Sequence, residues 1–329
     1  MSQYGSLFGD ERRETLLGQA VHAWFANGGG RCVVVRVEDL GALADGLSAL
    51  ETADDVTIVA APDVAGQSGP GGLDVLRAGY FALAAHCERM LNRLAILDPP
   101  PELDPQGILE WSRSTGLDTR LAALYYPWIG VLGPDGRSVS IPPSGHIAGT
   151  WARNDDERGV WTPPANLPLQ GVVCVAQPLT REHEFVLGQA GINTIRSQTE
   201  RGVRVWGPRT LSSSPTARSI ATVRLTATLG TFVPKVTAWA AFEPPGPRTW
   251  KRLRSAVEAV LEPLWRRGAF AGDTAADAFY IRADEEVNPP ELAAAGRIRV
   301  EFGFAATTPG EFVQMSVEQP SGDVAIYES

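Results

Sequence analysis

Residues 93–101, RLAILDPPP, set four apolar residues between an arginine and an aspartate, and three prolines follow. A short continuous apolar run is typical of a strand buried on both faces, because a strand with one wet face alternates instead. Proline has no backbone N–H to donate, so it does not continue a central strand. The stretch therefore predicts a buried strand over Arg93–Leu97 that ends at Asp98.

Two earlier segments show the same pattern, and helical segments separate them. Cys32–Val37 and Val56–Ala61 are short apolar runs, whereas Leu40–Leu50 and Leu73–Leu91 carry apolar residues at helical spacing. Strands that alternate with helices indicate βαβ units, in which helices cover both faces of a parallel sheet. Residues 1–100 are therefore predicted to be α/β.

The remaining elements of this region follow from capping residues, turns and apolar spacing. We expect an N-terminal helix that Asp10 caps and that Gly28-Gly29-Gly30 ends. Further elements are a buried strand over Leu121–Leu132, a helix over Ser144–Arg153, and strands over Val172–Ala176, Ile192–Ile195 and Val203–Trp206.

The C-terminal part of the chain has a different character. Arg248–Arg267 gathers its apolar residues on one helical face and leaves a basic face opposite. Phe279–Arg282, Arg297–Ala305 and Glu311–Val317 alternate like strands with one wetter face. These patterns predict an α+β domain. The basic helical face includes Arg248, Lys251, Arg252 and Arg254.

Length and composition exclude several classes of protein. The 329 residues favour two domains, and the net charge of −9 argues against a nucleic-acid binder. The three widely spaced cysteines do not form a disulfide framework, which favours synthesis in a reducing cytoplasm. The chain shows no apolar core of a signal peptide and no apolar run of the ~18 residues that a membrane span needs. We therefore expect neither nucleic acid nor membrane insertion.

A row of acids is the best case for an enzyme. Asp39, Asp63 and Asp98 each follow one of the first three predicted strands, and the carboxyl ends of parallel strands line a ligand crevice. Together these carboxylates could hold Mg²⁺ for phosphoryl chemistry. The alternative is that each acid caps the next helix and favours the positive end of that helix. We favour caps, because no Lys, Ser-Thr or His motif accompanies the acids.

Other motifs carry less chemistry. Gly28–Gly30 end a helix and precede a strand, which is the reverse of the order in a dinucleotide-binding fingerprint. Ser144 and His146 are neighbours in sequence without the G-x-S-x-G motif, and Ser144 is expected to cap the helix that follows. His183-Glu184 lacks the second histidine of H-E-x-x-H. We expect no catalytic, cofactor-binding or metal-binding residue, and no cofactor.

Tryptophans beside charges and prolines are the unusual feature of the second half. Trp161 lies in ERGVWTPPAN (157–166), and Trp206 lies in the related ERGVRVW (200–206). Aromatic residues and arginine are enriched where proteins bury surface against each other. Trp161 and Trp206 are therefore candidates for contacts between protein chains, with burial in the core as the alternative.

Eight stretches, in order and over nearly the whole chain, share the features of one family. They are WFANGGGRCVVVRV (24–37), HCERMLNRLAILDPPPELDP (86–105), ALYYPWI (123–129), PPSGHIAGTWARNDDERGVWTPPAN (142–166), GINTIRSQTERGVRVWGPRTLSS (191–213), AAFEPPGPRTWKRLRSAVEAVLEPLWRRGAFAG (240–272), FYIRADEEVNPPE (279–291) and RIRVEFGFAATTPGEFV (297–313). On these stretches the chain resembles the tail sheath proteins of contractile phages and related contractile injection systems.

The resemblance implies a subtilisin-like α/β domain with a largely parallel sheet and no protease chemistry over residues 1–210. It implies an α+β C-terminal sheath domain with a terminal strand arm over 211–329. Such subunits stack as hexameric rings around an inner tube and drive it outward by repacking. The implied partners are further copies of the chain, the inner tube protein, and baseplate and terminator or cap proteins, in a phage tail or a bacterial contractile injection particle.

The resemblance also assigns contact residues. A basic helix of the C-terminal domain commonly faces the tube, which makes Arg248, Lys251, Arg252 and Arg254 the expected tube contacts. C-terminal strands of such proteins join sheets of neighbouring subunits, so Glu311, Phe312 and Val313 join Trp161 and Trp206 as expected contacts between subunits.

One departure from the family pattern concerns the N-terminus. Family members usually begin with an extended arm, and here only 23 residues precede the WFANGG-like segment at Trp24. The expectation is that this arm is missing, which opens the alternative of a sheath-derived adaptor or terminal subunit that docks on tube or baseplate without contracting.

Overall fold

A computed structural model describes residues 15–67, 71–133, 135–307 and 312–328. The chain divides into two compact units, Met1–Ala221 and Thr222–Ser329. Both units mix helices with sheets, and each is described by itself.

The first unit is built on a six-stranded sheet with the order β1-β2-β3-β8-β9-β6. The pairs β1–β2, β2–β3 and β3–β8 are parallel, whereas β8–β9 and β9–β6 are antiparallel. The predicted parallel sheet is therefore confirmed for four strands. The strands are β1 Ile58–Ala60, β2 Leu94–Leu97, β3 Ala122–Tyr126, β6 Leu167–Pro168, β8 Ile192–Gln198 and β9 Gly202–Trp206.

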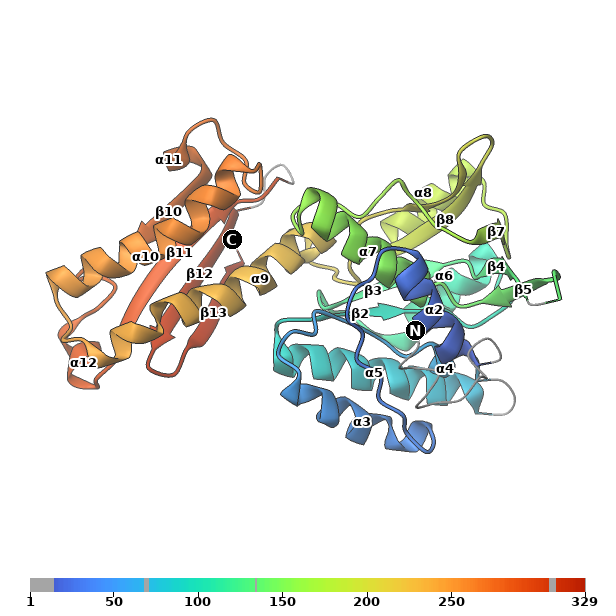
Figure 1. Cartoon of the computed structure of the whole chain (residues 1–329), viewed down its shortest axis with the longest axis horizontal. Coiled ribbons are helices and arrows are strands. Elements are labelled where there is room, and N and C mark those ends of the chain that lie inside the picture. Colours follow the sequence, from blue (N-terminus) through green and yellow to red (C-terminus); the bar gives the residue numbers. More distant parts are fainter. Residues whose placement is uncertain (1–14, 68–70, 134, 308–311, 329) are drawn as a thin grey trace. The chain divides into compact units, whose positions relative to one another are not determined.

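Helices cover both faces of the parallel strands (Figure 1). Helices α3 and α5 lie on one side of β2 and β3, and α2 and α7 lie on the other. All four residues of β2 are buried, as its continuous apolar run predicts. The helices are α2 Leu16–Ala26, α3 Leu43–Ala49, α4 Pro62–Ala65, α5 Gly72–Met90, α6 Pro105–Thr115, α7 Ser144–Arg158 and α8 Arg181–Gln189, with short 3-10 turns at Leu40–Ala42, Leu50–Thr52 and Pro215–Ala217.

The single strand expected over Leu121–Leu132 is two strands. Strand β3 ends at Tyr126, and β4 Ile129–Leu132 belongs to a separate sheet with the order β5-β4-β7. Pro127 has no N–H to continue the ladder of β3. Trp128 is turned inward, and its Nε1 donates to Pro99 O at 2.8 Å. The partners of β4 are β5 Ser138–Ile141 and β7 Val172–Val175.

The predicted strand over Cys32–Val37 is wrong. These residues form a coil, and within the described residues no backbone hydrogen bond joins them to β1. Trp24 fixes the backbone just before the coil, because its Nε1 donates a hydrogen bond to Gly30 O at 3.0 Å. Val37 packs so closely on Gly46 that a Cβ there would lie 2.6 Å from Val37 Cγ1. A β-branched composition does not make a strand unless a partner edge is within hydrogen-bonding reach.

Asp10, the expected cap of the first helix, lies outside the described residues. Thr15 caps α2 instead, and its Oγ1 accepts a hydrogen bond from Gly18 N at 3.0 Å. The expected glycine stop is confirmed, since the helix ends at Ala26 and Gly28 takes a φ of 105°.

The second unit is a four-stranded antiparallel sheet with the order β10-β11-β12-β13. Helices α9 and α10 lie side by side along this sheet (Figure 1). The buried faces of α10 and the sheet share Leu253, Val257, Leu261, Phe302 and Phe304. Its elements are α9 Ile220–Thr237, the 3-10 helix η5 Ala238–Phe242, α10 Pro247–Arg266, α11 Ala275–Ala278, β10 Phe279–Arg282, α12 Pro290–Ala294, β11 Ile298–Ala305, β12 Phe312–Gln319 and β13 Asp323–Glu328.

The predicted amphipathic helix and the three alternating strands of this unit are confirmed. Strand β13 was not predicted, since the last strand expected from the sequence pattern was Glu311–Val317. It pairs with β12 over six residue pairs, from Val313–Glu328 to Glu318–Asp323. Helix α9 was not predicted either, since its many β-branched residues favour strands and it contains Pro234.

Candidate interaction surfaces

The three acids of the enzyme hypothesis each serve a different helix. Asp98 is 2% exposed, and its Oδ1 accepts from Ser144 N at 2.8 Å at the start of α7. Asp39 accepts from Ala42 N at 3.1 Å, and Asp63 accepts from Leu17 N at 3.2 Å at the start of α2. The capping interpretation is confirmed for Asp39, which caps the helix that follows it. For Asp63 and Asp98 it is wrong in its choice of helix, because they cap α2 and α7, each 46 residues away in sequence. The described residues contain no group of three His, Cys, Asp or Glu side chains that could hold a metal ion.

Burial gives Asp98 an unusual protonation equilibrium. Desolvation raises its pKa to about 7, and the hydrogen bonds from Ser144 offset only part of that rise. Such a shift can accompany catalysis, but here the carboxylate lies enclosed beneath the N-terminus of α7. It acts as an internal helix cap.

Ser144 and His146 do not form a catalytic pair. They lie two positions apart on α7, so their side chains leave nearly opposite sides of the helix, about 160° apart. The backbone N–H of Ser144 donates to Asp98, and the Ser144 side chain does not cap the helix as predicted, since Pro143 stands at the N-cap without a side-chain hydrogen bond. His146 lies near His22 of α2. Burial and that second histidine lower the pKa of His146 to about 4, which keeps it neutral.

The segment ERGVWTPPAN is an arm fastened to its own unit. Helix α7 ends at Gly159, whose φ is 90° and whose Cβ, if present, would lie 2.4 Å from the Trp161 ring. Asn154 Nδ2 donates to Thr162 O at 2.8 Å, and Asn166 N donates to Val205 O of β9 at 2.7 Å. Trp161 is only 8% exposed. Its indole therefore supports the arm from beneath and offers little surface to another chain.

Trp206, by contrast, lies on the surface at the end of β9. It is 39% exposed, and the guanidinium carbon of Arg196 lies 3.5 Å from the centre of its ring. Arg196 also pairs with Glu184 of α8 at 2.8 Å. This stacking holds the indole in one orientation without burying it, which suits a contact residue.

The basic face of α10 divides into free and engaged residues. Arg248 and Lys251 are exposed, and neither has an ion pair or hydrogen bond among the described residues. Arg252 pairs with Glu243 at 2.7 Å and stacks on Trp239 at 4.2 Å. Arg254 donates to the backbone oxygen of Ala283. Two of the four expected tube contacts thus remain available without breaking an internal interaction.

Exposed apolar side chains beside this face were missed by sequence analysis, which concentrated on tryptophan. Phe242, the last residue of η5, is 91% exposed. Phe232 and Val236, one turn apart on α9, are 55% and 36% exposed. The sequence feature that could have indicated the exposure of Phe242 is Pro244-Pro245, because two prolines do not continue a helix or a central strand that would bury the ring.

The expected C-terminal contact residues lie in the middle of a sheet. Phe312 and Val313 belong to β12, which has β11 on one side and β13 on the other. Phe312 stacks on Tyr280 with ring centres 5.8 Å apart. Glu311 lies outside the described residues. Among the strands that the structure describes, β13 has no partner on the side that faces away from β12.

No helix in the described ranges is both long enough and apolar enough to cross a membrane.

Comparison with known proteins matches this architecture to one family. Residues 75–211 match the phage tail sheath protein central domain. The chain is 25% identical over 242 residues to a prophage major tail sheath protein of Pseudomonas aeruginosa, an alignment that takes in 69% of the chain. The chain spans 58% of the length of that curated relative.

Solved structures match over both units. The sheath complex of an extracellular contractile injection system, PVC, in its contracted state is 31% identical, with a TM-score of 0.79, and the match covers 94% of this chain and 82% of that one. A chain of the anti-feeding prophage (AFP) baseplate is also 31% identical, with a TM-score of 0.74 and coverage of 91% and 79%.

Proposed function

Because the chain belongs to the family of contractile tail sheath proteins, we propose that it is a structural subunit of a sheath that encloses an inner tube and moves it by repacking. The observation that carries this proposal is the likeness to the PVC sheath, which covers 94% of the chain and so includes both units. The relatives are structural proteins rather than enzymes, and the capping roles of the acids agree with that.

The finer architecture of the family belongs to this proposal. The first unit, Met1–Ala221, would correspond to the subtilisin-like domain expected over residues 1–210, and the second, Thr222–Ser329, to the C-terminal sheath domain expected over 211–329. The four parallel strands between two helical layers support the first assignment. The four-stranded sheet with a strand at the C-terminus supports the second.

Work in such an assembly comes from packing and needs no cofactor. A sheath has two packings of the same subunit, an extended metastable one and a contracted stable one. The interface between subunits is then a bistable element, and the small free-energy difference at each one adds over many copies.

The tube contact is assigned to the basic face of α10. Arg248 and Lys251 are exposed and unpaired among the described residues, so they can meet acidic tube residues directly. Arg252 and Arg254 would have to exchange an internal partner for the tube. Such contacts at an interface rim set register and association rate more than affinity, and salt weakens them.

Contacts between subunits are assigned to the C-terminal sheet and to Trp206. The unpaired edge of β13 can accept a strand, or β13 itself can leave β12 and join a neighbour's sheet. In the second case Phe312 and Val313 of β12, next to Glu311, would face the incoming strand. Baseplate and terminator proteins would meet the same surfaces at the two ends of the sheath, in a phage tail or a bacterial injection particle.

Electron microscopy of the native particle tests the proposal. Stacked rings of this subunit around a tube are expected, with Arg248 and Lys251 turned toward the tube. The likeness to an AFP baseplate chain favours one second candidate, an adaptor that forms a single ring at the end of the tube. A single terminal ring would select the adaptor, and a particle without this subunit beside a tube would overturn both.

A further inference from the structure

Phe242 is presented outward by a rigid local framework. Ala240 in the same 3-10 helix is 1% exposed, so the helix is anchored in the core of the second unit. Arg252 supports the backbone on both sides of Phe242, because it stacks on Trp239, which precedes Phe242, and pairs with Glu243, which follows it. A phenylalanine that is 91% exposed on such a support has the character of a binding anchor.

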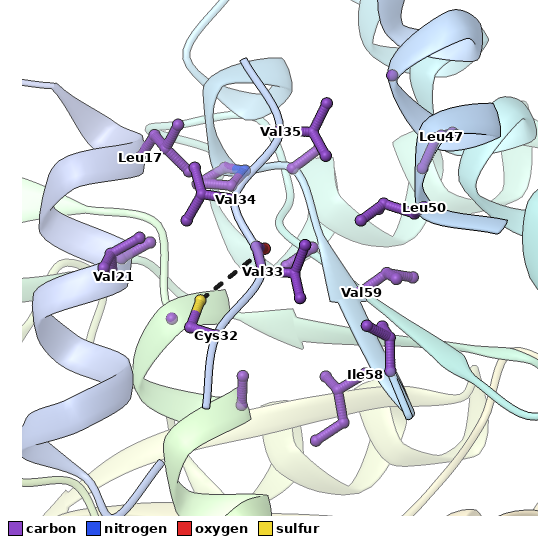
Figure 2. A pocket seen from close by; sticks show the side chains of 18 of the residues that line it. Leu17, Val21, Cys32, Val33, Val34, Val35, Leu47, Leu50, Ile58 and Val59 are labelled. Atoms are coloured by element: carbon purple, nitrogen blue, oxygen red, sulfur yellow. Dashed lines mark hydrogen bonds between the residues drawn. The ribbon is translucent and has the colours of Figure 1, made fainter. Parts of the chain in front are cut away.

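The first unit contains an apolar cavity of about 300 Å³. Figure 2 shows Cys32 and Val33 of the coil, Val21 of α2, Leu47 of α3 and Val59 of β1 around it. The cavity exists because the coil over residues 31–37 does not pair with β1, which leaves the edge of the sheet and the helices around it incompletely packed. Cys32 and Val33 are exposed, so the cavity reaches the surface at the coil.

The charges around the two features are complementary. Part of the lining comes from the segment 38–63, which has seven acidic residues and no lysine or arginine; of these acids, Asp55 and Asp63 line the cavity themselves. The segment 243–254 after Phe242 has four basic residues and one acid, Glu243, which pairs with Arg252. Arg248 and Lys251 are assigned to the tube, so Arg252 and Arg254 are the basic residues that would meet a neighbouring copy. Arg31 at the cavity pairs with Asp55, and Arg36 lies in the same coil, so the segment 31–63 has seven acids and two arginines and stays acidic by five charges. The seven acids are Glu38, Asp39, Asp45, Glu51, Asp54, Asp55 and Asp63.

We propose that Phe242 of one copy inserts into the apolar cavity of the first unit of a neighbouring copy. The occupant is a second copy because both halves of a complementary contact occur on one chain. A contact between two different patches is heterologous, and its repetition closes a ring or propagates a helix. The inference therefore rests on the proposed sheath function and adds a specific contact to it.

Loss of the phenyl ring should weaken assembly and leave the fold intact. Phe242→Ala is expected to raise the concentration needed for assembly by about tenfold or more, since a buried aromatic anchor carries a large share of an interface. Phe185→Ala is the matched control, because Phe185 is also exposed, at 67%, and lies on α8 away from the cavity lining. Equal effects of the two variants would contradict the proposal.

A disulfide can report the contact directly, because the free thiol of Cys32 lines the cavity. In the full chain with Cys174→Ser, Phe242→Cys should give an oxidation ladder of dimers and higher multiples when particles are oxidised. Adding Cys32→Ser should abolish the ladder. Cross-links that persist without Cys32, or that join Cys32 to a different protein, would overturn the proposal.

The unmodified protein supplies a second measurement. A maleimide should label Cys32 in the dispersed protein, and this labelling should be lost in the assembled particle. If particles form and Cys32 is labelled equally in both states, the contact is wrong while the sheath function stands. If the protein forms no ring with further copies under any condition, the sheath function and the contact both fail.

Discussion

Trp161 and Phe242 each stand two residues before a pair of prolines, yet Trp161 is 8% exposed and Phe242 is 91% exposed. The first ring lies against Gly159 at the end of α7, and hydrogen bonds to α7 and β9 hold the arm over it. The second is the last residue of the 3-10 helix η5, and the next two residues, Glu243 and Pro244, bond to Arg252 and Thr249 of α10. The same local pattern thus buries an aromatic ring under its own arm in the first unit and exposes one to solvent in the second.

The largest expected effect tests the internal anchor. Trp161→Ala should lower the free energy of unfolding of the first unit by ~3–5 kcal/mol, because it leaves a cavity under the arm. Phe242→Ala should change stability by less than about 0.5 kcal/mol, because the ring is solvated in the isolated chain. Urea unfolding of both variants measures the difference. Similar losses in the two variants would break the comparison.

The next effect concerns the glycine beneath the indole. Gly159→Ala should destabilise the protein by roughly 2–3 kcal/mol, since φ is 90° and the new Cβ would lie 2.4 Å from the Trp161 ring. Gly171 has a φ of 79° with open space around it, so Gly171→Ala reports the backbone cost alone. Thermal unfolding should show the larger loss for Gly159→Ala. Equal losses would mean that the indole does not constrain the arm.

A third effect concerns the pH dependence of stability that the buried carboxyl of Asp98 causes in the first unit. Burial raises the pKa of Asp98 from 3.8 to about 7, so between these values the folded state holds a proton that the unfolded state has released. Stability should therefore fall as pH rises from about 4 to about 7, by an amount on the order of 2 kcal/mol. Asp98→Asn should flatten this dependence in urea titrations at pH 5 and pH 8. Asp45→Asn, at an exposed position of α3, should leave it unchanged.

The smallest effect on stability concerns the support of Phe242. Arg252→Ala should cost less than about 1 kcal/mol, because the Arg252–Glu243 pair is solvent-exposed. It should nevertheless impair assembly, since Phe242 loses the stacking and the ion pair on either side of it. Sedimentation of assembled protein measures this, with Arg266→Ala as control because Arg266 forms a similar surface pair with Glu262. Normal assembly of Arg252→Ala would show that the ring needs no such support.

The local sequence pattern was enough to predict elements whose buried residues follow one regular spacing. RLAILDPPP gave a strand with all its core residues buried, and Arg248–Arg267 gave an amphipathic helix, because apolar spacing alone decides which face is covered. The glycine stop after α2 and the cap that Asp39 provides also followed from local chemistry, whereas Asp63 and Asp98 cap helices 46 residues away, which only the tertiary structure decided.

The tertiary structure alone decided which matching segments pair and which side chains stay exposed. Cys32–Val37 has the composition of a strand and lies in a coil, whereas the C-terminal tail, with less apolar character, forms β13 because β12 offers it an edge. Phe242 and Trp161 differ for the same reason. Pairing and burial depend on residues distant in sequence, and a periodic pattern carries no information about which of those distant residues come within reach.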